Sequence, residues 1–218
     1  MNPRFRVALP ILLFLFIIIP LGIYSTILEE NNITQNNTTL LNVPDVRQPT
    51  NSSSGPTSLQ AVIDYYGTDI MVDKLMNMTN TSENGTTPDN IAQAARNLGF
   101  SVEVKENMTL QDLQQNINQG IPTIIVCQAW KDNSTGNWTN DTDDGHYMVV
   151  IGMDDQNIYF EDPAILGSRG YIPLQEFMER WHDLYFNPQT GNNTTVNRLG
   201  IIITGAQPVS RSPFVKIE

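Results

Sequence analysis

Residues 48–67 read QPTNSSSGPTSLQAVIDYYG and predict the first helix of the folded part of the chain. The run at 54–56, Ser-Gly-Pro, suits a helix start because proline is tolerated in the first turn. Gly67 supplies a stop signal. Ser54 is therefore expected at the start of a buried helix. The apolar residues that follow it at helical spacing are Leu59, Val62, Ile63 and Tyr66.

Outward from this helix, the first half of the chain predicts mainly helices and the second half mainly strands. Thr87 and Thr109 are suited to cap further helices, which Gly99 and Gly120 would end. Helices followed by a mostly antiparallel sheet indicate an α+β fold. The other predicted segments are a short helix at 70–77, a late helix at 174–181, and strands at 100–104, 121–129, 147–152, 157–161 and 199–204.

A second informative stretch is residues 145–163. His146 follows Gly145 and directly precedes a predicted strand, GHYMVVIG. Asp162 lies sixteen residues later, at the end of the partner strand of a predicted hairpin, and Pro163 follows it. The histidine and the carboxylate are thus expected at the same end of neighbouring strands.

These positions suit nucleophilic catalysis. A nucleophile at Ser54 would face the free N–H groups and the positive end of a helix dipole. The same N–H groups, with the Gln48 side-chain amide as a second donor, can bind a developing oxyanion. His146 can act as general base, and Asp162 can hold the other ring nitrogen and so fix the tautomer. Taken singly, each residue also has a plain structural role: a helix N-cap, a core histidine and a turn residue.

The motifs together resemble the papain-like peptidases of the C39 family, over about residues 43–204. In that family the order is oxyanion Gln, nucleophilic Cys, His, and Asp before Pro, which matches Gln48, position 54, His146 and Asp162. The resemblance implies a papain-like α+β fold and hydrolysis of peptide bonds. The members known best process bacteriocin leader peptides after a double glycine as parts of ABC transporters. This chain lacks the transporter parts, so that substrate does not carry over.

Position 54 departs from the family pattern, because it holds Ser where the family has Cys. A cysteine in such a site works as a thiolate, whereas a serine hydroxyl needs concerted proton removal by His146. Three interpretations follow from the sequence. Ser54 is a serine nucleophile, it marks an inactive domain that still binds peptides, or it is an engineered replacement of cysteine.

Composition excludes several classes of function. The 218 residues carry a net charge of −11, which argues against nucleic acid as a partner. The single cysteine, Cys127, lies in an apolar strand and is expected to be buried. Of the two histidines, His182 is expected at the end of the late helix, where its charge would meet the helix dipole. The acidic loop 140–145 lacks the glutamate of a calcium loop, so no metal and no cofactor is predicted.

The amino terminus predicts a membrane segment. Arg4 and Arg6 precede an uncharged, largely apolar stretch from Val7 to Leu28, which is long enough to span a bilayer. An uncleaved signal-anchor at 1–28 is favoured over a cleaved signal peptide, because no small-x-small cleavage site is evident. By the positive-inside rule, Arg4 and Arg6 stay in the cytoplasm, and the chain after the membrane segment is expected outside the cell. We expect a polar stalk at 29–42, the peptidase-like domain at 43–204 and a tail at 205–218.

Thirteen Asn-x-Ser/Thr sequons agree with an exported, glycosylated chain, although a general Asn and Thr bias would also produce sequons. Their style suggests an archaeal surface protein. The sequons begin at Asn32, Asn36, Asn37, Asn51, Asn77, Asn80, Asn84, Asn107, Asn133, Asn137, Asn140, Asn192 and Asn193.

The sequence therefore predicts a membrane-anchored extracellular peptidase of C39 type, acting on a peptide or protein substrate and monomeric. The first alternative is an inactive domain of the same fold that binds peptides at the cell surface. The second is a glycosylated envelope protein without a functional cleft.

Overall fold

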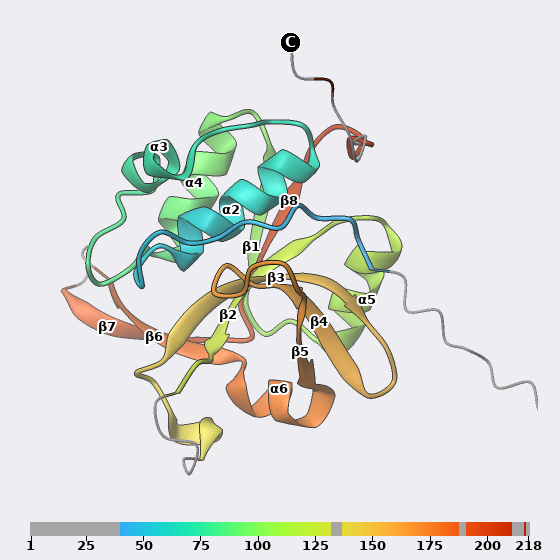
Figure 1. Cartoon of the computed structure of the whole chain (residues 1–218). Helices are drawn as coiled ribbons and strands as arrows, with labels where there is room; N and C mark the ends of the chain where they lie inside the picture. The colour runs from blue at the N-terminus through green and yellow to red at the C-terminus, as the bar shows by residue number, and fades with distance from the viewer. Residues whose placement is uncertain (1–39, 132–136, 188–190, 211–215, 217–218) are drawn as a thin grey trace, which may run out of the picture. The chain divides into compact units, whose positions relative to one another are not determined.

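A computed structural model describes residues 40–131, 137–187, 191–210 and 216. Within them, a six-stranded sheet has the strand order β1-β8-β2-β3-β4-β5, and every neighbouring pair is antiparallel (Figure 1). A separate hairpin pairs β6 with β7. The strands are β1 (Ser101–Lys105), β2 (Thr123–Gln128), β3 (Gly145–Met153), β4 (Asn157–Glu161), β5 (Gly170–Pro173), β6 (His182–Asn187), β7 (Asn192–Asn197) and β8 (Gly200–Thr204).

Helices cover both faces of the six-stranded sheet. On one face α2 and α4 pack against alternate residues of the central strands, such as Val126 and Val149. On the other face α5 and α6 pack against the intervening residues, such as Ile125 and Met148. This is why β2 reads as a continuous apolar run: both of its faces are buried. The helices are α2 (Ser54–Tyr65), α3 (Val72–Met78), α4 (Pro88–Asn97), α5 (Leu110–Asn118) and α6 (Leu174–Arg180), with a short 3-10 turn η1 (Trp138–Asn140).

The α+β class and the antiparallel sheet predicted from the sequence are confirmed. Strand β5 and the β6–β7 hairpin were not predicted, because β5 has four residues and β7 is almost wholly polar. The placement of His182 at a helix end was wrong. Helix α6 ends at Arg180, and His182 is the first residue of β6, with Nε2 2.7 Å from the backbone oxygen of Asp141.

The segment that precedes α2 is bound along the side of the domain. Leu41, within the expected stalk, is buried, and its N–H donates to the Ile151 carbonyl. The Val46 N–H donates to the Glu161 carboxylate at 2.9 Å, and the Gln48 N–H donates to the Pro163 carbonyl at 3.0 Å. Gln48 is therefore held beside the segment that carries Asp162. Beyond the sheet, the Val209 N–H donates to the Tyr65 carbonyl, so part of the expected tail also contacts the domain.

The expected membrane segment at 1–28 and most of the stalk lie outside the described residues. Within the part of the chain that the structure describes, no helix combines the length and the apolar character needed to cross a bilayer.

Helix α5 offers a direct test of the local folding rules. The Thr109 hydroxyl accepts the Asp112 N–H, and the Asp112 carboxylate accepts the Thr109 N–H, which makes a complete capping box. We expect Thr109→Ala to lower the free energy of unfolding by about 1 kcal/mol in urea titrations. Gln115→Ala, an exposed change in the same helix, is the control and should leave it unchanged or raise it slightly. Equal effects of the two changes would contradict the capping role.

Candidate active site

The turn before α2 holds Ser54 at the start of the helix. The Ser53 hydroxyl donates to the Thr50 carbonyl at 2.8 Å and accepts the Thr50 N–H at 3.0 Å. The Thr57 hydroxyl donates to the Ser53 carbonyl at 2.7 Å, within the first turn of the helix. Ser54 is the first helical residue, and 6% of its surface is exposed. Its hydroxyl thus lies at the end of α2 where backbone N–H groups lack helical partners.

His146 and Asp162 form a close, buried pair. His146 Nε2 lies 2.6 Å from Asp162 Oδ1, and both residues are buried. His146 is the second residue of β3, and Asp162 directly follows β4, so pairing of these two strands brings them together. In the tautomer that carries its proton on Nε2, His146 donates to the Asp162 carboxylate and keeps Nδ1 as an acceptor.

Asp162 also accepts two other hydrogen bonds. The Trp130 indole N–H donates to Oδ2 at 3.0 Å, and the Ala164 N–H donates to Oδ1 at 2.8 Å. Trp130 lies just beyond β2, has a backbone φ of 61° and keeps 58% of its surface exposed. The sequence analysis did not identify Trp130. Its position after an apolar strand carries no catalytic signal, and only the fold places its indole against Asp162.

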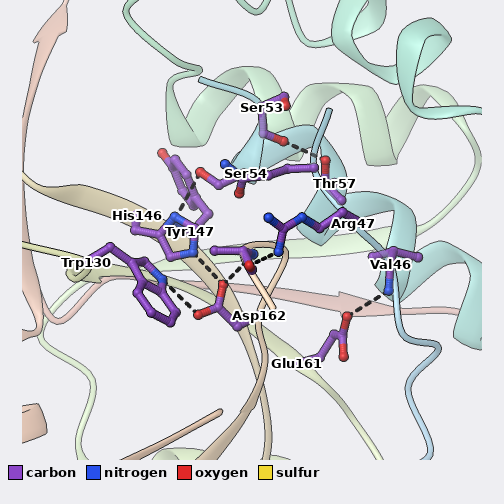
Figure 2. Close-up of polar contacts among 12 residues, drawn as sticks. Val46, Arg47, Ser53, Ser54, Thr57, Trp130, His146, Tyr147, Glu161 and Asp162 are labelled. Carbon is purple, nitrogen blue, oxygen red and sulfur yellow. Dashed lines mark hydrogen bonds and ion pairs between the residues drawn. The ribbon is translucent and has the colours of Figure 1, made fainter. Parts of the chain in front are cut away.

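Ser54 contacts the backbone directly after His146. Its Oγ accepts the Tyr147 N–H at 3.3 Å, although 93 residues separate the two. Figure 2 shows the His146 ring between Ser54 and Asp162. Among the described residues, no hydrogen bond joins the Ser54 hydroxyl to the imidazole. The residues predicted for catalysis are therefore neighbours, with the Ser54 hydroxyl held by a backbone amide.

Gln48 reaches the same region through its backbone. Its side-chain nitrogen donates to the Thr50 carbonyl at 2.9 Å, and its Oε1 is buried without a hydrogen-bond partner. An amide nitrogen carries two N–H bonds, so one remains for another acceptor. The oxyanion role predicted for Gln48 requires this second N–H to turn towards the space above Ser54.

Two cavities border these residues. One, of about 1030 Å³, opens beside Asp162 and Trp130, and its lining combines apolar residues such as Met148 and Phe160 with charged residues such as Arg169 and Glu176. The other, of about 610 Å³, opens beside Ser54 and is mostly polar. Space for a ligand therefore exists on both sides of the Ser54–His146–Asp162 group.

The remaining candidates lie apart from this chemistry. Cys127 is buried, as predicted, and burial raises the pKa of its thiol, so it is a poor nucleophile. In the acidic loop, the Asp141 carboxylate pairs with Lys131. Among the described residues, no group of three His, Cys, Asp or Glu side chains is arranged to hold a metal ion.

The sequence profile of the Peptidase C39 family matches residues 42–192. The chain belongs to this family. The resemblance drawn from Gln48, Ser54, His146 and Asp162 is thereby confirmed at the level of the family.

Curated relatives include transporters and small proteins. Residues of this chain are 28% identical over 128 positions to the transport/processing ATP-binding protein ComA of Streptococcus pneumoniae, a match covering 58% of this chain but 16% of ComA. The chain thus corresponds to a small part of that transporter. An uncharacterized protein of Methanothermobacter marburgensis is 29% identical over 153 residues, covering 70% of this chain and 87% of the relative.

Solved structures share the fold. A C39-like peptidase from Bacillus anthracis has a TM-score of 0.59 at 18% identity, covering 79% of this chain and all of that one. The Streptococcus ComA peptidase domain has a TM-score of 0.52 at 22% identity, and the match covers 72% of this chain and 95% of that chain. A double glycine motif protease from an AMS/PCAT transporter, solved in complex with the leader peptide, has a TM-score of 0.53 at 22% identity. The match covers 78% of this chain and 94% of that chain.

The Trp130–Asp162 hydrogen bond can be tested by removing the donor and keeping an aromatic ring. We expect Trp130→Phe to lower the free energy of unfolding by about 1 kcal/mol, because the bond reaches a buried carboxylate. A double-mutant cycle with Asp162→Ala isolates the pair from other effects of each change. If the losses from Trp130→Phe and Asp162→Ala simply add, the indole does not support the carboxylate.

Proposed function

We propose that this protein is a membrane-anchored, extracellular C39-type peptidase that hydrolyses peptide bonds with Ser54 as the nucleophile. The observation that supports this most directly is the grouping of Ser54, His146 and Asp162 at the meeting point of α2, β3 and β4. Two cavities beside the group leave room for an extended peptide.

In the proposed mechanism His146 acts first as base. Rotation of the Ser54 hydroxyl away from the Tyr147 N–H brings Oγ towards His146 Nδ1. Oγ attacks the carbonyl carbon as Nδ1 takes its proton, and Asp162 stabilises the imidazolium. The imidazolium then protonates the leaving amine, which gives an acyl-serine. Water, deprotonated by the same nitrogen, attacks the ester, releases the acid and restores the Ser54 hydroxyl.

The negative charge of each tetrahedral intermediate needs donors close to Ser54. The backbone N–H of Ser54 lies in the first turn of α2, where the helix dipole favours negative charge. The second N–H of the Gln48 amide is the proposed partner donor. Its buried Oε1 has no hydrogen-bond partner, so only the bond from Nε2 to the Thr50 carbonyl opposes a turn of the side chain towards a ligand.

A second candidate function is peptide binding without cleavage. It is favoured by the Ser54 hydroxyl, which is bonded to a backbone amide and not to His146. The Cβ–Oγ bond of serine is shorter than the Cβ–Sγ bond of cysteine. In a site suited to cysteine, the serine Oγ therefore lies further from the imidazole than Sγ would. In this case the two cavities would hold an extended peptide, and the His146–Asp162 pair would be structural.

The two functions are separated by the reactivity of position 54. For a serine nucleophile, we expect a fluorophosphonate probe to label the full chain once, at Ser54, as determined by mass spectrometry. Ser54→Ala and His146→Ala should abolish labelling. Absence of labelling, with saturable peptide binding, would contradict the enzymatic proposal and favour the binding function.

Ser54→Cys tests whether the surroundings activate a nucleophile. We expect the new thiol to react with iodoacetamide faster than a free cysteine, with a pKa below about 8.5, because of the helix N-terminus and His146. Alkylation should slow as the pH falls through that pKa, and His146→Ala should remove the gain. Native protein supplies the control, since Cys127 is buried and should stay unmodified. A thiol no more reactive than free cysteine would contradict this prediction.

The proposed membrane location is supported by the sequence of the amino terminus, from Arg4 through the apolar stretch 7–28. The sequon residues Asn77 and Asn137 are exposed on the domain, as a glycosylated surface would require. Protease added to intact cells should therefore remove an epitope placed at Glu218. Cells opened with detergent are the control for cleavage. Protection of the epitope in intact cells would overturn the orientation.

A further inference from the structure

The charged residues that line the cavity beside Ser54 are all acidic, whereas those that line the cavity beside Asp162 carry both signs. The volume of the cavity beside Ser54 is about 610 Å³, and its walls come from the turn before α2, the loop between α3 and α4, and strand β6. Gly85 and Gly145 also line the cavity, and because they have no side chains they leave space in it. Its polar lining residues are Asn51, Ser52, Ser54, Asn80, Thr81, Ser82, Glu83, Asn84, Thr86, Thr87, Asn90 and Asp183, with Tyr147 and Tyr185.

The charges of this lining all have one sign. Glu83 is exposed at the rim, and Asp183 is partly buried at the base. The described lining includes no lysine, arginine or histidine. Nearby, His182 precedes Asp183 but directs Nε2 to the Asp141 carbonyl, and Asp89 adds negative charge near Tyr185. The cavity is therefore set up to favour a positive charge.

Asp183 is held against the catalytic strand. Its Oδ1 accepts the Gln128 side-chain N–H at 3.0 Å. A Cβ added to Gly145 would collide with the same oxygen, so only glycine before His146 leaves room for this carboxylate. Burial raises the pKa of Asp183, and the opposing effects of its hydrogen bonds and of His182 are smaller. A cation bound here would compensate this loss of hydration.

A long basic side chain needs both an apolar surface for its stem and acceptors for its charged end, and the cavity offers both. The methylene stem needs an apolar surface, and the rings of Tyr147 and Tyr185 line the cavity. The Tyr147 ring is fixed, because it is buried and its hydroxyl donates to the Thr86 carbonyl at 3.0 Å. An ammonium group beyond the rings would find carboxylate, hydroxyl and amide oxygens as acceptors.

We propose that this cavity is a specificity pocket for a basic peptide residue, with Asp183 as its main anion and Glu83 as a weaker one at the rim. The inference rests on the proposed function, because it names the class of peptide that would be presented to Ser54. Placed beside Ser54, the pocket selects substrates with lysine or a similar cationic residue near the scissile bond.

The test measures binding separately from cleavage. The full chain with Ser54→Ala is titrated with three capped amino acids, N-acetyl N-methylamides of lysine, norleucine and glutamate, and binding is followed by NMR at the amides of Gly85, Gly145 and Leu184. Norleucine has the same stem length without the charge. We expect lysine to bind about tenfold more tightly than norleucine, and glutamate not to bind.

Variants assign the preference to the pocket. In the same background, Asp183→Asn should weaken lysine binding about tenfold and Glu83→Gln by less, with no effect on norleucine. Glu103→Gln, the same loss of charge on β1 outside the cavity, is the control and should change nothing. Where Asp183→Asn fails to fold in circular dichroism, Glu83→Gln and the comparison of the three probes decide the question.

The outcomes distinguish this inference from the proposed function. Equal binding of lysine and norleucine, or equal effects of Asp183→Asn and Glu103→Gln, would overturn the basic pocket, even if Ser54 reacts with fluorophosphonate. Selective lysine binding without any reactivity at Ser54 would support the pocket and contradict hydrolysis. Cleavage of peptides that carry a lysine, and not of their norleucine counterparts, would support both.

Discussion

The carboxylate of Asp162 accepts hydrogen bonds from three separate parts of the chain, and the site depends on this convergence. His146 approaches from β3, Trp130 from the end of β2, and the Ala164 N–H from the segment after Asp162 itself. A buried carboxylate is stable only when such donors replace its hydration. To bring these donors to Asp162, the ends of β2, β3 and β4 must lie side by side. The preceding segment is tied in as well, because the Gln48 N–H reaches the Pro163 carbonyl.

The His146–Asp162 pair follows the family pattern, whereas position 54 departs from it. The helix start, the Tyr147 N–H and the nearby imidazole would suit a thiolate, which needs an anion-stabilising environment. A hydroxyl in the same place must lose its proton during attack, so its distance from Nδ1 matters more. In the proposed mechanism, the reaction therefore depends on how far Ser54 can move when a substrate is present. The His146–Asp162 pair is already held in place by hydrogen bonds, whereas the Gln48 amide must still turn.

The two cavities differ in charge in a way that the shared fold does not require. The cavity with charges of both signs is formed largely by strands and α6, whereas the cavity with acidic charges alone is formed largely by the loop between α3 and α4 and by β6. Loops on a stable framework are where related proteins differ in specificity. Similarity of fold to peptidase domains of transporters thus leaves the substrate open, and the side chains around Ser54 supply the chemical argument for a basic residue.

Much of this architecture follows from the sequence alone. Local signals such as the Thr87 and Thr109 caps and the apolar run of β2 are sufficient to predict elements, because capping and burial act over a few residues. The order of Gln48, Ser54, His146 and Asp162 was also sufficient to name the family. The sequence did not reveal the Trp130 donor, the β6–β7 hairpin or the position of Asp183 beside Gly145. Each of these depends on contacts between residues far apart in the chain, and only the packed fold creates such contacts.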